Sequence, residues 1–158
     1  MEASEPGLEV MNFGLQGSGP DVQYLIYREL GRQFNSQLLM LSSHASNITR
    51  VLQRFTPFQS PDGGAFLLPK PYFTLTQDGG IELNGVPVPD ERIEEGDPRF
   101  EYSPRRPGLG RVIERSRWKY RLARLVNYQP FPEYDDPTGP AWLLMERIIE
   151  LNATTGRR

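Results

Sequence analysis

The chain has 158 residues, 37% of them apolar and 11% aromatic, and its formal net charge is −2. This length suits one domain with a modest core, and the aromatic content argues against a disordered chain. The lack of cysteine excludes disulfides and thiolate metal sites, and the near-neutral charge gives no general argument for nucleic-acid binding.

Residues 1–20 are predicted to form an extended N-terminal arm. They are acidic, contain Gly and Ser residues and show neither a helical nor a strand period. Such a segment is flexible alone and can become ordered against a neighbour. The start “MEASEPGLEV” has no apolar run of signal-peptide length, and the chain nowhere reaches the roughly 18 consecutive apolar residues of a transmembrane helix. We therefore expect a soluble, cytoplasmic protein without a membrane partner.

Residues 21–56 are predicted to form a long helix, opened by Pro20 and Asp21. Positions spaced alternately three and four apart are apolar or aromatic, with Gly31 as the exception: Tyr24, Tyr27, Gly31, Phe34, Leu38, Leu41, Ala45, Ile48, Leu52 and Phe55. This spacing over more than four heptads is typical of a coiled-coil seam or a bundle helix. An unbroken helix of about 35 residues, at ~1.5 Å each, would be ~50 Å long, which is more than a small sheet covers.

Weak helix formers interrupt this pattern and leave an alternative open. Asn35-Ser36, Ser42-Ser43 and Ser46-Asn47 favour two helices, or a helix, a strand and a helix, with Ser46 or Asn47 capping the second helix. Thr56-Pro57 is expected to end the helical region in both cases. The candidate protein-interface residues on the seam are Phe34, Leu38, Leu41, Ile48, Leu52 and Phe55.

Residues 57–158 are predicted to form a β-rich domain closed by a helix. Residues 57–69 are expected to be a loop. In “YFTLTQDGGIELNGVPVP” apolar and polar residues alternate around “DGG” and “NG”, which predicts consecutive hairpins. The last helix is predicted over about 140–152, begun by Pro140 and buried through Leu144, Met145, Ile148, Ile149 and Leu151. The expected fold class is therefore α+β, with a small, mostly antiparallel sheet.

Charge is segregated between two neighbouring segments. Residues 90–97, “DERIEEGD”, contain five acids and one Arg, whereas residues 105–124 contain eight bases and one acid. Within “RSRWKYRLARL” a strand would place bases on one face and aromatic residues on the other. The candidate charged-face residues are Arg115, Arg117, Lys119, Arg121, Glu94, Glu95 and Asp97. This basic face is expected to meet the acidic segment, another subunit or a phosphate backbone.

The sequence contains no pattern typical of a catalytic or metal centre. His44 is the only histidine, and its neighbouring serines do not make a triad without an orienting acid. Phosphate-binding motifs such as GxxxxGK[ST] and GxGxxG are absent. A carboxylate-based hydrolase that uses Glu95 and Asp97 is the third interpretation. We expect no catalytic residues, no metal and no cofactor.

The order of segments resembles a known class of proteins. An arm, a patterned helix, a Gly- and Pro-punctuated β section (“TLTQDGGIELNGVPVP”) and a closing helix resemble small bacteriophage virion subunits of the neck, tail terminator or baseplate. The resemblance is architectural and transfers no functional residues. It implies a non-enzymatic structural subunit of a homo- or hetero-oligomer that contacts its neighbours through its arm, seam helix and charged hairpin, and that is cytoplasmic when made and then located in the virion. The alternative is a nucleic-acid-binding module that uses residues 105–124.

Overall fold

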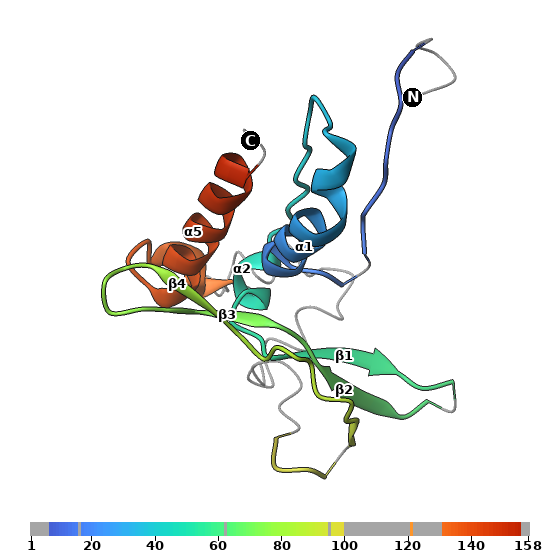
Figure 1. Cartoon of the computed structure of the whole chain (residues 1–158). Coiled ribbons are helices and arrows are strands. Elements are labelled where there is room, and N and C mark those ends of the chain that lie inside the picture. The colour runs from blue at the N-terminus through green and yellow to red at the C-terminus, as the bar shows by residue number, and fades with distance from the viewer. Residues whose placement is uncertain are drawn as a thin grey trace.

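The structure, a computed structural model, describes residues 7–15, 17–61, 63–94, 96–99, 121 and 131–155. The described helices are α1 (Pro20–Ile26), the π-helical η1 (Tyr27–Gly31), the 3-10 turn η2 (Arg32–Phe34), α2 (Asn47–Arg50), the 3-10 turn η3 (Pro132–Asp135) and α5 (Pro140–Thr155). The strands are β1 (Phe55–Gln59), β2 (Ala65–Pro69), β3 (Tyr72–Leu75), β4 (Ile81–Asn84) and β5 (Ile93–Glu94). Helices and antiparallel strands confirm the α+β class (Figure 1).

The prediction of one long helix over 21–56 is wrong. Helical backbone runs from Pro20 through η1 and η2 and stops at Phe34. Asn35 then takes a left-handed conformation with φ 47°, and its N–H donates to the carbonyl of Arg32. Asparagine tolerates this conformation better than most residues and often ends helices. The 3-4 spacing therefore continues in the sequence beyond the point where the helix has ended.

A short second helix, α2, confirms the alternative in which residues 21–56 hold more than one helix. Ser46 is its N-cap residue, although its side chain makes no capping hydrogen bond. Between η2 and α2 the chain is not helical, and Gln23 of α1 donates to the carbonyl of Ser42 across 3.1 Å. Thr56-Pro57 does not end a helix, because both residues lie inside β1.

The segment 57–69, expected to be a loop, is largely the antiparallel hairpin of β1 and β2. Lys70 N–H donates to Arg54 O and Ser60 N–H donates to Gly64 O, so the hydrogen-bonded pairs of this hairpin fall on even-numbered residues. Pro57 and Pro69 therefore occupy the other pairs, where the backbone nitrogen points away from the partner strand. Proline is tolerated there because no ladder bond is lost. The two prolines made this segment look like a loop in the sequence, but their positions in the register are compatible with paired strands.

Strands β3 and β4 confirm the predicted “DGG” hairpin, with Gly79 at φ +79° in the turn. The second predicted hairpin, through Asn84-Gly85, is wrong. Gly85 has a positive φ of +71°, as the turn requires, but Val86 and Val88 are in no strand and are exposed. Prolines at 87 and 89 remove two donors from that segment, which weakens any pairing there.

The main core lies where α1, α2, β3 and α5 meet. Tyr24, Val51, Phe73, Leu144 and Ile148 form its buried centre. In Figure 1, α1 and α5 stand beside each other, and the β1–β2 hairpin extends away from them. Strand β2 pairs with both β1 and β5, and buries Leu67 against Ile93 in register.

The C-terminal helix is confirmed, at Pro140–Thr155, and is slightly longer than expected. Of its predicted apolar face, Leu144 and Ile148 are buried, Met145 and Leu151 pack against the core, and Ile149 is 42% exposed. Asn152 is also buried and donates its amide to the carbonyl of Ile148, one turn earlier. None of the helices in the described ranges is long and apolar enough to cross a membrane.

Candidate interaction site

Exposed apolar side chains gather in two stretches near the N-terminus. Of the sixteen large apolar side chains exposed among the described residues, ten lie in residues 8–15 and 30–40: Leu8, Val10, Met11, Phe13, Leu15, Leu30, Phe34, Leu38, Leu39 and Met40. The rings of Phe13 and Phe34 are 5.9 Å apart and join the two stretches. We call these ten side chains the apolar surface. Exposed apolar clusters of this kind mark protein contacts more often than isolated exposed residues do.

The six predicted seam residues are not brought onto one face. Ile48 is fully buried, so it belongs to the core and cannot contact another protein. Phe55 is half-buried in β1 and Leu41 is half-buried after η2. Leu38 is 75% exposed and belongs, with Phe34, to the apolar surface, whereas Leu52 is exposed outside it. The sequence identified two residues of that surface and predicted that the arm contacts a neighbour, but it marked no single residue of the arm, because the arm has no period to detect.

A groove of about 490 Å³ opens on the core side of α1. Its apolar wall is formed by Tyr24, Phe73, Ile81, Leu83 and Leu151. These side chains come from α1, from the β3–β4 hairpin and from α5, which meet at the main core. The volume falls within the range of about 300–1,000 Å³ that is usual for ligand sites. The groove was not predicted from the sequence, because it needs three elements that are far apart in the chain.

Two arginines line the same groove. Arg28 of η1 is 34% exposed, and its guanidinium lies 5.8 Å from the centre of the Tyr24 ring. Arg147 of α5 is 45% exposed and donates to Glu150 across 2.7 Å, which raises the pKa of Arg147. Arg28 donates to its neighbour Glu29 across 2.7 Å. Exposed ion pairs of this kind contribute little to the stability of the fold. The groove therefore combines an apolar wall with two arginines and with Glu150, which also lines it and pairs with Arg147.

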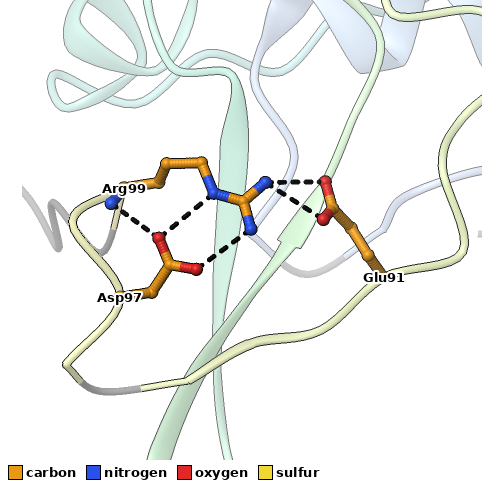
Figure 2. A network of polar contacts seen from close by, with 3 residues as sticks. All are labelled: Glu91, Asp97 and Arg99. Atoms are coloured by element: carbon orange, nitrogen blue, oxygen red, sulfur yellow. Dashed lines mark hydrogen bonds and ion pairs between the residues drawn. The ribbon is translucent and has the colours of Figure 1, made fainter.

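The acidic segment 90–97 binds arginines that lie next to it in the sequence. Figure 2 shows Arg99 between Asp97 and Glu91, with its guanidinium donating to both oxygens of each carboxylate at 3.0–3.1 Å. Arg92 pairs with Glu94 across 2.5 Å and places its guanidinium 3.7 Å from the centre of the Phe66 ring. Glu95 lies outside the described residues. Glu91, Glu94 and Asp97 therefore each pair with an arginine close to them in the sequence. The number of acids in the segment did not indicate these pairs.

The same network shifts the pKa values of Asp97 and Arg99. The hydrogen bonds from the side chain and the backbone N–H of Arg99 hold the pKa of Asp97 below its ordinary value. Asp97 and Glu91 in turn raise the pKa of Arg99. All three groups are at the surface, so this cluster organises the chain after β5 and is screened by salt. It fixes a charged loop in which the carboxylates of Glu91 and Asp97 are both held by Arg99.

The predicted basic face lies almost wholly outside the described residues. Arg115, Arg117 and Lys119 belong to that part, while Arg121 is described, exposed and helical. The predicted strand is therefore wrong at residue 121.

His44 has a local role in the turn before α2. Its Nδ1 accepts the backbone N–H of Ser46 at 3.2 Å and lies 3.1 Å from the Ser46 hydroxyl. The imidazole thereby fixes the turn that leads into the helix. Within the described ranges, no three His, Asp or Glu side chains come together as metal ligands. Comparison of the chain with family models, with curated proteins and with solved structures finds no match.

Proposed function

We propose that this protein is a non-enzymatic structural subunit of a multi-subunit assembly, which contacts its neighbours through the apolar surface. One observation carries the proposal: the large exposed apolar side chains are concentrated in the arm and in residues 30–40, away from the main core. Leu38 and Met40, at 75% and 78% exposed, are the most extreme. Burying one such side chain against a partner is worth about 1.5–3 kcal/mol.

The setting that we propose is a bacteriophage tail, neck or baseplate. The support is the order of an arm, helices, small antiparallel hairpins and a closing helix, together with an exposed arm that is suited to contact a neighbour. The long seam helix that contributed to the resemblance is replaced by α1 and the exposed segment after it. In this proposal the apolar surface, rather than a seam helix, makes the contacts with neighbouring subunits.

Sedimentation of the full chain over a range of concentrations tests the proposal. We expect concentration-dependent association, weakened about tenfold or more by Leu38→Ser combined with Met40→Ser. The matched control is Val86→Ser with Val88→Ser, which removes two exposed apolar side chains outside the surface and is expected to leave association unchanged. A chain that stays monomeric, alone and with the products of adjacent genes, would contradict the proposal.

A further inference from the structure

The N-terminal arm and the groove have complementary chemistry. In the arm, Leu8, Val10 and Met11 are exposed, and Glu9 lies among them. Residues 1–15 contain three acids and no base, and the first base of the whole chain is Arg28. The groove is lined by apolar side chains, by two arginines, Arg28 and Arg147, and by one acid, Glu150, so its charged lining has an excess of one positive charge. Complementary charge around an apolar centre sets the register of an interface.

Residues 7–15, the described part of the arm, do not lie against the groove of their own molecule (Figure 1). Figure 1 shows the arm leaving the body on the side of α1 away from α5, whereas α5 and the β3–β4 hairpin form the groove on the other side. The contact between Phe13 and Phe34 holds the arm close to η2 on that far side. An arm held there projects away from its own molecule, so the exposed side chains of Leu8 and Met11 are available to a second molecule.

We infer that the groove binds the N-terminal arm of a second copy of this chain, so that copies join head to tail. This inference rests on the proposed function and names its partner. The side chains of Leu8 and Met11 enter the groove against Phe73 and Leu83, and the Glu9 carboxylate lies near Arg28 and Arg147. A head-to-tail contact of this type builds a ring or an open filament, according to the rotation between copies.

Mixed disulfide formation tests the inference, because the natural chain contains no cysteine to interfere. One full-length copy carries Met11→Cys, and a second copy of different mass carries Thr154→Cys at the groove. We expect a mixed disulfide under mild oxidation. The matched control pairs Met11→Cys with Arg99→Cys, which places the thiol on an exposed segment away from the groove and is expected to cross-link at least tenfold less.

Charge variants then test the register. Glu9→Lys in the arm copy is expected to lower the cross-linking yield about fivefold. Arg28→Glu with Arg147→Glu in the groove copy is expected to restore it, and circular dichroism verifies that each variant is folded. Restoration by the swapped charges supports the inference, because a merely misfolded groove would not recover.

The outcomes separate the inference from the proposed function. A chain that associates in sedimentation but gives no mixed disulfide above the control overturns the groove assignment and leaves the structural role intact. A chain with both cysteines that closes an internal disulfide on dilution shows that its own arm fills the groove, and also overturns the inference. Absence of both association and cross-linking contradicts the proposed function as well.

Discussion

The carboxylate of Asp21, in the first turn of α1, forms an ion pair with the ammonium of Lys70, which lies 49 residues later between β2 and β3. The Asp21 side chain is fully buried and that of Lys70 is 10% exposed. Asp21 Oδ2 accepts a hydrogen bond from the Lys70 ammonium. The buried Oδ1 of the same carboxylate has no hydrogen-bond partner among the described residues. The pair ties the start of the helical layer to the strands.

Removal of one partner of this pair should be costly. Asp21→Leu or Lys70→Met leaves a buried charge without its counterion, and we expect each to lower the free energy of unfolding by about 3–5 kcal/mol. The double variant should recover much of that loss, because neither charge then remains. Urea denaturation measures all three variants, with exposed Glu82→Gln as a control expected within about 0.5 kcal/mol of the wild type. Equal, additive losses would contradict a direct pairing.

Gly19 should tolerate no side chain next to this pair. A Cβ at residue 19 would lie 2.5 Å from Asp21 Oδ1 and 3.1 Å from Arg50 Cβ. We therefore expect Gly19→Ala to lower the melting temperature, since the carboxylate must move away from Lys70. Thermal melts of Gly19→Ala with and without Asp21→Ala, which leaves no atom at the Oδ1 position, measure the coupling. If Gly19→Ala lowers the melting temperature equally when the Asp21 carboxylate is absent, contact with that carboxylate is not the cause of the loss.

Ile48 and Leu38 should respond differently to truncation, although both occupy the same pattern in the sequence. Ile48 is fully buried, so Ile48→Ala is expected to cost about 2–5 kcal/mol of unfolding free energy. Leu38 is 75% exposed, so Leu38→Ala should change monomer stability by less than about 0.5 kcal/mol. Denaturation at low protein concentration measures both. Comparable losses at the two positions would favour a continuous seam helix.

Asn35 ends the first helical region through its left-handed backbone, with φ 47°. Asn35→Ala should destabilise the fold by about 1 kcal/mol, because most residues with a Cβ avoid this conformation. Asn35→Gly should be neutral or slightly stabilising, since glycine adopts it freely. Thermal melts compare the two variants, and a rise in helical circular dichroism for Asn35→Ala would indicate that the helix has extended instead.

The Arg99 cluster makes a prediction about pH. Because the folded-state pKa of Asp97 lies below its ordinary value of 3.8, its contribution to stability is present above about pH 4 and is lost as pH falls through the folded-state value. Arg99→Gln should raise the pKa of Asp97 towards 3.8, as measured by NMR titration of the carboxyl carbon. Arg147→Gln, on α5, is the control and should leave Asp97 unchanged.

Local signals in the sequence predicted the elements that depend on neighbouring residues. Pro140 and the apolar spacing after it marked α5, and the alternation around “DGG” marked β3 and β4. The failures share a different cause. Ile48 and Leu38 follow one period, yet Leu38 lies exposed in the non-helical segment after Asn35, whereas Ile48 is buried in α2.

The groove depends on contacts that no local pattern encodes. Tyr24, Phe73 and Leu151 meet only after three elements have packed together. The Asp21–Lys70 pair likewise joins residues that each look like ordinary surface charges in the sequence. Arg92 and Arg99 were within reach of sequence reasoning, because they stand beside the acids that they bind.

The register of Pro57 has a consequence for how copies of this chain can associate. Among the described residues β1 pairs only with β2, so its outer side is where a foreign strand would add. The nitrogen of Pro57 points to that outer side and carries no hydrogen, so an incoming strand would lack a donor in the middle of β1. Growth into fibrils by the addition of strands is thereby disfavoured at this edge of the sheet. Association through other surfaces of the molecule is not affected.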